Sequence, residues 1–444
     1  MCINKNCCVV ESIQKLTREQ KEAVGLLSIG TFLEYFDLML YVHMAVLLNE
    51  LFFPKTDPFT ASLLSALTFC STYMLRPFGA FIFGYIADQI GRKATIIITT
   101  LLMSLTCIVM GTLPTHAQIG LTSSCIMIVC RMVQGMTATA ESRGAELYIT
   151  ESFKAPIQYP LVAMITVFTA VGTSAALGVC TIFTNEALLA HNDYSWRIVF
   201  YIGAAVGLVG TVARTSLKEA SDYTNKRKML HTQLESKEVN WKESYENSLT
   251  FNAPSKMTAV YYFIIHCARP PCFYFVYIYC SDILKHQFGL TPNQVISQNF
   301  LVSIFDLAGL LFLAYISFRV YPLLILKFKL FLFFISISSF PLVIDIYPSP
   351  NVVLIYQCLA ALFVFDHIPA SPIFYKYFPI LRRFTYTSLI SAFAKLLTYL
   401  VTSFGLVFAT KAFGYSGIFI ILVPVGVGFF ISVDYFHKKE LEVN

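Results

Sequence analysis

The chain alternates long apolar stretches with short polar connections. A helix that crosses the hydrocarbon core of a bilayer needs about 20 mostly apolar residues. On that template the first half of the chain holds six spans, at 25–53, 60–87, 94–113, 119–141, 159–184 and 196–216. The second half holds six more, at 257–280, 295–318, 325–346, 351–370, 385–410 and 414–436. The pattern therefore predicts an all-α integral membrane protein with about twelve transmembrane helices.

A polar stretch at 217–256, rich in Lys, Glu, Ser and Asn, separates the two sets of spans. It divides the chain into an N-terminal bundle of six helices at 25–216 and a C-terminal bundle of six helices at 257–437. We expect the stretch to be a cytoplasmic linker, because it is too short for a separate ligand-binding domain. Cytoplasmic tails at 1–24 and 438–444 complete this division.

The basic residues predict the orientation of the chain in the membrane. Most of the 32 Lys and Arg residues lie in the tails, in the linker and in the loops on the same side, whereas the opposite loops hold only Lys55, Arg197, Lys285 and Lys411. Cytoplasmic loops of membrane proteins carry an excess of Lys and Arg. We therefore expect a multi-pass protein of the cell inner membrane with both termini in the cytoplasm.

Composition narrows the classes of function. Charged residues make up 13% of the chain and hydrophobic residues 56%, whereas a soluble domain has about 25% charged residues. The net charge of +6 arises between the spans, which favours membrane orientation over nucleic-acid binding. The 12 cysteines show no metal-ligand spacing, so we expect no metal and no cofactor. The sequence also lacks a Walker loop and the GxSxG and HExxH motifs, which argues against an ATP-driven pump or an enzyme.

Two acidic residues in the first span are candidates for binding a proton or a substrate. Glu34 and Asp37 are three residues apart and Tyr41 follows one turn later, so the three share one helix face. An ionised side chain at the centre of a membrane costs roughly 2.5–3.5 kcal/mol on insertion scales. Paired carboxylates at such a position can exchange a proton or hold a substrate cation. The alternative is that they anchor basic side chains of neighbouring helices.

The first half also contains basic and polar partners within its spans. Arg76 lies in the second span, and Arg131 lies in the fourth with Gln134 beside it at i,i+3. A buried Arg can bind a carboxylate with two hydrogen bonds, although a static clamp between helices remains an alternative. His43 and His266 can carry protons, but a single His within a span is more often a hydrogen-bond partner between helices.

Four further charges lie within spans of the second half, at Arg269, Asp306, Asp366 and Lys395. The structural interpretation is that Asp306 or Asp366 pairs with Arg269 or Lys395. If one of them lined a cavity, it would contribute to substrate selectivity.

A polar motif connects the second and third spans. It contains Gly84, Asp88, Gly91, Arg92 and Lys93 in the spacing GxxxDxxGRK. Gly84 permits close packing, and Asp88 can cap a helix or join a charge pair. The motif resembles the signature loop of the major facilitator superfamily, which lies between the same two spans. Gln89 replaces the basic residue that is usual there.

Further residues resemble one branch of that superfamily, the metabolite:proton symporters that include the proline/betaine transporters. The similar positions are Glu34–Asp37, Leu40–Tyr41, Phe52–Pro54, Arg76–Gly79, Arg131–Gly135, Glu141, Glu146–Tyr148, Glu151, and Trp196–Arg197 with Phe200. The resemblance implies two six-helix bundles that alternate access to a central site. It also implies symport of a small zwitterionic or organic-acid metabolite with a proton.

The resemblance assigns roles to individual residues. Glu34 and Asp37 would take the proton or the cationic end of the substrate, with Tyr41, Gln134 and Glu141 nearby. Arg131 would bind an anionic end. The residues that would stabilise the gate are Gly84, Asp88, Gly91, Arg92 and Lys93. The expected partners are thus a small molecule, a proton and the lipid bilayer.

Several positions depart from the pattern of that branch. Arg143 stands where a glycine is usual, and Lys376 stands where an acid is expected. The repeat of the signature loop after the eighth span is replaced by Arg319–Pro322, which contains neither its Gly nor its Asp. The alternative function is therefore a transporter-like scaffold or sensor that does not transport and has a degenerate C-terminal half.

Overall fold

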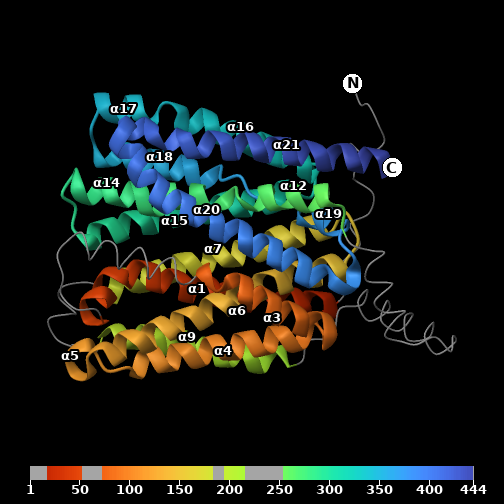
Figure 1. Cartoon of the computed structure of the whole chain (residues 1–444), viewed down its shortest axis with the longest axis horizontal. Helices are drawn as coiled ribbons and strands as arrows, with labels where there is room; N and C mark the ends of the chain where they lie inside the picture. The colour runs from red at the N-terminus through yellow and green to blue at the C-terminus, as the bar shows by residue number, and fades with distance from the viewer. Residues whose placement is uncertain (1–17, 53–72, 184–194, 216–253, 444) are drawn as a thin grey trace.

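The computed structural model describes residues 18–52, 73–183, 195–215 and 254–443, and every regular element in these ranges is a helix (Figure 1). Seven of the described helices are long and apolar enough to cross a membrane, and two shorter helices are also apolar. The helices run nearly parallel to one another in two layers (Figure 1). This arrangement agrees with the all-α membrane architecture that the hydrophobic pattern predicts.

The N-terminal bundle forms one of the two layers (Figure 1). Its helices are α1 (Arg18–Phe52), α3 (Arg76–Gln89), α4 (Arg92–Thr112), α5 (His116–Ile119), α6 (Leu121–Ser152), α7 (Gln158–Phe183) and α9 (Ser195–Arg214). Two glycines bring these helices together. A Cβ atom at Gly79 of α3 would lie 2.3 Å from the carbonyl oxygen of Met136 in α6, and one at Gly172 of α7 would lie 2.3 Å from that of Phe32 in α1. Only glycine fits at such close approaches.

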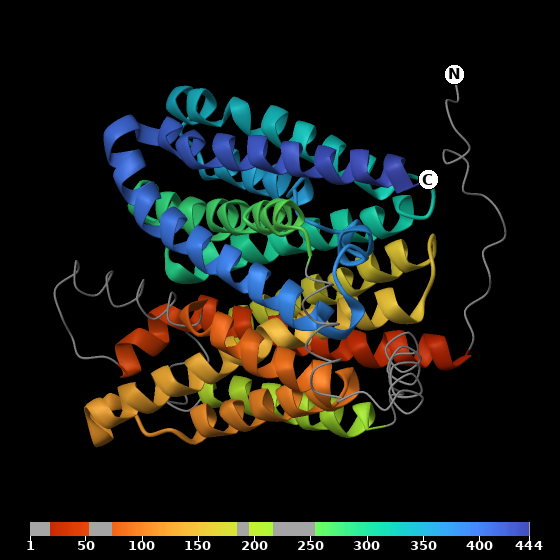
Figure 2. The ribbon, with the colours of Figure 1, turned by 45° about the vertical axis from the view of Figure 1, so that its right-hand side comes forward.

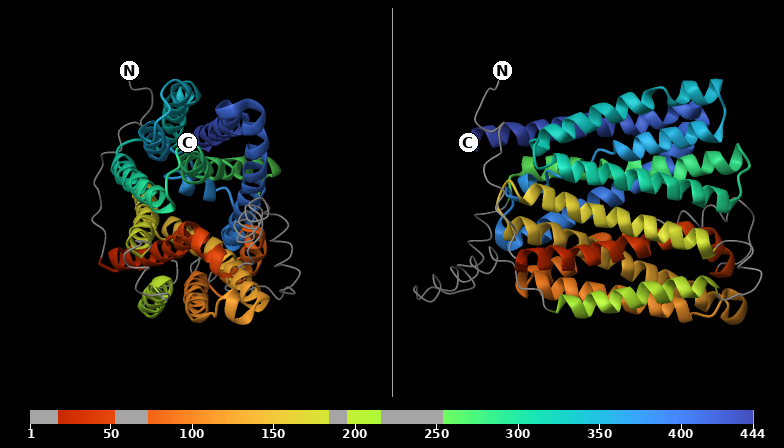
Figure 3. Two further views of the ribbon diagram at one scale, coloured as in Figure 1. Left: turned by 90° about the vertical axis from the view of Figure 1, so that its left-hand side faces the viewer. Right: turned by 180° about the vertical axis from the view of Figure 1, so that it is seen from behind.

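The C-terminal bundle forms the other layer and has more interruptions. Its elements are α12 (Lys256–His266), α13 (Arg269–Phe273), the π-helix η1 (Tyr274–Tyr279), α14 (Cys280–His286), α15 (Pro292–Ile316), α16 (Pro322–Ser338), α17 (Phe340–Ile346), α18 (Pro350–Leu362), α19 (Ser371–Tyr375), the 3-10 helix η2 (Ile380–Arg382), α20 (Arg383–Phe413), the 3-10 helix η3 (Gly414–Ile418) and α21 (Phe419–Val443). Figure 3 shows the two bundles from one end and from behind.

Three spans that the sequence predicts as continuous are broken, and the one at 325–346 is divided at Ser339, between α16 and α17. The span at 257–280 is interrupted after His266, before Pro270 and Pro271, and the span at 351–370 ends as a helix at Leu362. Proline removes a backbone donor and clashes with the preceding turn. The irregular segment at 363–370 contains buried side chains, with Phe365 0% and Asp366 2% exposed. Irregular backbone at this depth is tolerated only where protein or an aqueous cavity surrounds it.

Other helices are longer than the predicted spans. α6 continues to Ser152 rather than ending at 141, and α21 continues to Val443 rather than ending at 436. The first turns of α1 and the last turns of α21 lie at the same end of the bundles, together with α19 (Figure 2). Asp88 and the segments 153–157 and 376–382 lie at this end as well. We call it the motif end.

Candidate functional site

A network of buried polar side chains joins α1, α4 and α6 inside the N-terminal bundle. The Oδ2 atom of Asp37 lies 3.7 Å from Nη1 of Arg131, with side chains only 7% and 2% exposed. Arg131 Nη1 donates a hydrogen bond to Gln134 Oε1 at 2.7 Å, and Cys107 Sγ donates one to Asp37 Oδ1 at 3.0 Å. A separation of 3.7 Å is longer than a hydrogen bond. Asp37 and Arg131 therefore form an ion pair in which these two atoms are not hydrogen-bonded to one another.

The other predicted residues of this region lie around that network. Glu34 is buried one turn before Asp37 on α1, at 3% exposure, so both acids lie on the protein-facing side of the helix. A cavity of about 10 Å³ adjoins Asp37, which is space for about one water molecule. Tyr41 and Glu141 belong to α1 and α6, but their side chains lie outside the described part of the structure.

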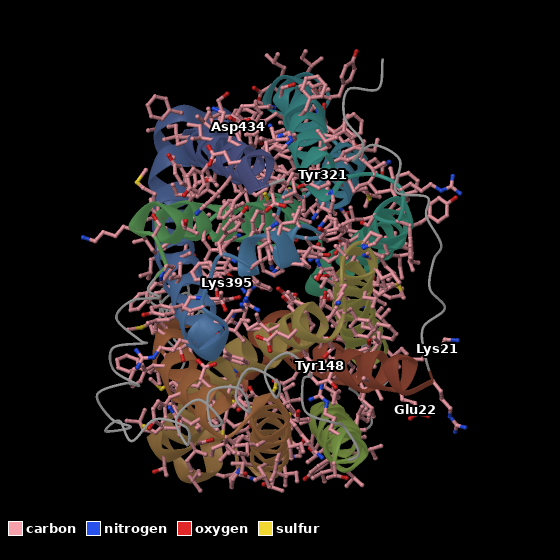
Figure 4. All side chains as sticks on the ribbon, turned by 90° about the vertical axis from the view of Figure 1, so that its right-hand side faces the viewer. Lys21, Glu22, Tyr148, Tyr321, Lys395 and Asp434 are labelled. Carbon is pink, nitrogen blue, oxygen red and sulfur yellow. The ribbon has the colours of Figure 1, made fainter. Side chains whose placement is uncertain are left out.

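Arg76 lies at the start of α3, near the boundary between the bundles. Its guanidinium stacks over the ring of Tyr73, 4.1 Å from the ring centroid. That ring in turn packs against Tyr399 of α20, with the centroids 4.1 Å apart. Lys395, one turn earlier on α20, lies where the two bundles face one another (Figure 4). Arg76 and Lys395 thus approach the interface from opposite bundles.

The gate motif contacts the C-terminal bundle through Asp88. Asp88 Oδ2 accepts hydrogen bonds from the backbone nitrogen of Thr385 at 3.0 Å and from Thr385 Oγ1 at 2.6 Å. Thr385 lies in the first turn of α20, where a helix has unpaired N–H groups and favours a negative charge. A Cβ atom at Gly84 would lie 3.0 Å from the Cα atom of Thr385. The motif therefore caps a helix of the opposite bundle at close range.

The rest of the motif forms the turn that the sequence suggests. Gly91 has a φ of 133°, which side chains rarely tolerate, and α4 begins at the next residue. The side chain of Arg92 lies outside the described part of the structure, and that of Lys93 is half-buried. An ion pair also joins the two bundles nearby, between Arg383 Nη1 and Glu151 Oε1 at 3.6 Å.

A larger network at the same end joins α6 to the C-terminal bundle. Arg143 Nη1 lies 3.0 Å from Glu146 Oε2 and donates a hydrogen bond to Tyr375 Oη at 2.5 Å. The Tyr375 hydroxyl donates to Glu146 Oε2. His367 Nε2 lies 3.3 Å from both Glu146 Oε1 and Arg143 Nη1, and Arg143 Nη2 lies 3.4 Å from His266 Nδ1. All five side chains are buried, with exposures between 0% and 7%.

Sequence reasoning did not select this network as a site. Arg143 was notable only as a departure from a glycine, and His266 was expected to be an ordinary hydrogen-bond partner. The interruption of the tenth span places His367 and Asp366 in the irregular segment between α18 and α19. The available signals were the Arg in place of Gly at 143 and the prolines at 369 and 372.

Of the four charges that the sequence singles out within spans of the second half, Arg269 and Asp366 form an ion pair. Arg269 Nη1 binds Asp366 Oδ2 at 2.7 Å, and Asp366 Oδ1 accepts from the Ile368 nitrogen at 3.0 Å. Asp306 lines a cavity of about 320 Å³ together with Lys329, which the sequence analysis did not select. Within the described ranges, no group of three His, Cys, Asp or Glu side chains is arranged to hold a metal ion.

Two curated relatives match part of the chain. The chain is 35% identical over 201 residues to the inner membrane metabolite transport protein YhjE of Escherichia coli (strain K12), and this match covers 43% of the chain and 44% of the relative. It is 28% identical over 200 residues to the proline/betaine transporter of the same strain, covering 45% of the chain and 40% of the relative. The chain therefore matches less than half the length of these curated relatives.

Two solved structures share the fold over nearly the whole chain. The proton:xylose symporter XylE bound to 6-bromo-6-deoxy-D-glucose has a TM-score of 0.74 at 13% identity, covering 94% of this chain and 95% of that one. The transporter FucP in the outward conformation has a TM-score of 0.67 at 14% identity, covering 93% and 98%. At these identities the likeness shows the fold alone, and it confirms the predicted arrangement of two six-helix bundles.

A sequence profile of the Major Facilitator Superfamily matches residues 27–281. This range covers more than half of the 444 residues, and it includes the gate motif and the Asp37 network. The chain therefore belongs to the major facilitator superfamily of membrane transporters.

Proposed function

We propose that the chain is a secondary transporter of the cell inner membrane that carries a small zwitterionic or organic-acid metabolite together with a proton. The observation that carries this proposal is the buried pair of Asp37 and Arg131 at 3.7 Å. Each member is an expensive group to retain inside a membrane bundle, and each offers one of the two charges that such a substrate needs.

The pair can couple a proton to a substrate. When Asp37 takes a proton, its negative charge beside Arg131 is removed, and a substrate carboxylate can supply a negative charge there with charge-assisted hydrogen bonds. Gln134 already accepts one N–H of Arg131 and orients the guanidinium. When Asp37 is ionised, it competes with the substrate for Arg131. A substrate and a proton are therefore favoured together, as symport requires.

The contacts between the bundles supply the gate. Asp88 with Thr385, Glu151 with Arg383 and the Arg143 network all lie at the motif end. Under the proposed orientation, with both termini in the cytoplasm, this is the cytoplasmic end. Rocking of one bundle against the other would break these contacts and open the pathway to the cytoplasm.

The names of the relatives support this substrate class. Matched curated proteins include a proline/betaine transporter and a metabolite transport protein of the inner membrane. Proline and betaine are zwitterions, so they present both charges that Asp37 and Arg131 would bind.

Uptake into proteoliposomes tests the proposal. Purified chain is assayed with radiolabelled proline, glycine betaine and 2-oxoglutarate, with and without an inward pH gradient. We expect gradient-dependent accumulation of one of them. Asp37→Asn should abolish the gradient-dependent accumulation, because the proton site that couples transport to the gradient is lost. Asp345→Asn, which changes an exposed acid on α17, should leave it unchanged.

The opposite result favours the scaffold that the sequence analysis left open. If none of the three substrates accumulates in vesicles with correctly folded protein, the proposed transport is rejected in favour of a scaffold or sensor that does not transport. If a substrate accumulates equally in the Asp37→Asn variant, Asp37 has no part in coupling and the mechanism above is rejected.

A further inference from the structure

The C-terminal bundle contains a cavity of about 320 Å³ that belongs to neither the Asp37 network nor the gate. Ligand pockets in proteins typically have volumes of about 300–1,000 Å³ and apolar walls with a few polar groups. The walls come from α13, η1, α15, α16 and the end of α18 with the segment after it. All its lining residues belong to this bundle, and most are apolar or aromatic. The exceptions are four charged side chains at Arg269, Asp306, Lys329 and Asp366.

Only two of these four charges are paired. Arg269 and Asp366 bind one another at 2.7 Å, and the second oxygen of Asp366 accepts from a backbone nitrogen. Asp306 and Lys329 have no hydrogen-bond or ion-pair partner within bonding distance among the residues that the structure describes. An unpaired charge inside a membrane bundle is costly and usually marks a function. The cavity thus offers one carboxylate and one ammonium group that make no direct contact with an opposite charge, although the four charges interact electrostatically across it.

Broken helices converge on the same place. Arg269 follows the interruption between α12 and α13, and Asp366 lies in the irregular segment after α18. In membrane transporters, interrupted helices often form ligand sites, because the freed backbone groups and nearby charges can face a cavity. The interrupted helices are therefore a second, independent indication that this cavity binds a ligand.

The cavity reaches the outer surface of the bundle between α15 and α16. Phe312 of α15 and Phe328 of α16 line it and are nevertheless 64% and 61% exposed. The unpaired charges lie deep in the membrane. At 1.5 Å per residue, Asp306 is about 15 Å from the nearer end of α15, close to the middle of a hydrocarbon core about 30 Å thick. A lipid headgroup lies at the membrane surface, so it does not reach a charge at this depth.

We infer that this cavity is a second ligand site, which binds a small zwitterion with an apolar body, such as an apolar amino acid. The amino group lies at Asp306, the carboxylate at Lys329 and Arg269, and the apolar part against the aromatic wall. The site is separate from the Asp37 and Arg131 pair, so it stands whether or not that pair transports the same molecule.

Equilibrium dialysis tests the site with the full chain in nanodiscs made of phosphatidylglycerol, which has no zwitterionic headgroup. The probes are labelled L-leucine, valine, methionine and phenylalanine. We expect saturable binding of at least one of them. For leucine, 4-methylpentanoate lacks the amino group and isoamylamine lacks the carboxylate, so each should compete about tenfold or more weakly.

Matched variants assign the binding to the cavity. Asp306→Asn and Lys329→Met should each weaken binding about tenfold or more. The controls are Asp345→Asn and Lys327→Met, since Asp345 is exposed and Lys327 instead pairs with Asp434 at 2.9 Å. Both should bind as the unmodified chain does. If one cavity variant fails to fold, by helical content and size-exclusion profile, the other decides.

Several results would overturn the inference. They are the absence of saturable binding for all four amino acids, and unchanged binding in the folded cavity variants. A third result concerns lipid. If phosphatidylethanolamine copurifies with the unmodified chain but not with Asp306→Asn, and no amino acid binds, the cavity is a lipid site. The Asp37→Asn variant separates the two proposals, because it should lose uptake but keep this binding.

Discussion

Replacing Tyr375 with Phe tests whether the Arg143 network holds the two bundles together. The Tyr375 hydroxyl accepts a hydrogen bond from Arg143 and donates one to Glu146, so it connects α19 to α6. Phe keeps the ring in its buried position and removes both bonds. Arg143 and Glu146 remain paired with one another, because they lie three residues apart on the same helix.

The structure sets the size of the expected effect. A hydrogen bond to a charged group contributes about 1.5–3 kcal/mol, and since one hydroxyl makes both bonds we expect a total of about 2–3 kcal/mol. This free energy favours the state in which the bundles are together at the motif end. Its loss should raise the ratio of separated to joined molecules about 30- to 150-fold. A separated state populated at about 1% would then rise to roughly a quarter or more.

Double electron–electron resonance measures this ratio directly. Spin labels are attached at Lys154 and Arg382, which are exposed at the motif end on opposite bundles, in a background without other reactive cysteines. Tyr377→Phe is the matched control, because Tyr377 donates to Glu440 at 2.5 Å within the C-terminal bundle. The long-distance population should grow for Tyr375→Phe and not for Tyr377→Phe. Equal distance distributions for all three proteins would refute the reasoning.

Three further predictions concern packing and the gate. Gly79→Ala places a Cβ atom 2.3 Å from a backbone carbonyl oxygen of α6 and should lower the free energy of unfolding by about 1–3 kcal/mol. The control Gly25→Ala, whose Cβ atom would have nothing within 4 Å, should leave it unchanged. Equal thermal melting temperatures for the two variants would contradict this prediction. Arg214→Leu removes hydrogen bonds to two carbonyl groups of α1 and should cost at least about 2 kcal/mol in denaturant unfolding, so an unchanged midpoint would be evidence against this clamp. Asp88→Ala removes both bonds to Thr385 and should increase the separated population seen with the same spin labels, which an unchanged population would disprove.

The predictions from sequence succeed where contacts are local or are imposed by the bilayer. Twelve apolar stretches of membrane-spanning length predict the two bundles, because a bilayer requires that length. The i,i+3 spacing of Arg131 and Gln134 places them on one helix face, and the structure shows their hydrogen bond at 2.7 Å. The motif that connects the second and third spans likewise lies between α3 and α4 in the structure.

The contacts between the bundles could not be derived in this way. Asp88 binds a residue 297 positions away, and Glu146 binds His367 at a separation of 221 positions. Neither periodicity nor hydropathy pairs residues across such distances. The break in the span at 351–370 could not be predicted for a different reason. Its apolar residues are compatible with a continuous helix, but the helix ends at Leu362.

The arrangement of charges in the Arg143 network suits a contact that must both hold and release. Separating a buried ion pair costs about 3–5 kcal/mol, because a charge remains without its partner. Here Arg143 and Glu146 belong to the same helix, so they stay paired when the bundles move apart. Opening breaks only their bonds to the neutral hydroxyl of Tyr375 and to the rings of His367 and His266. Under the proposed alternating access, the network can thus stabilise the joined state by a few hydrogen bonds without exposing an uncompensated charge on opening.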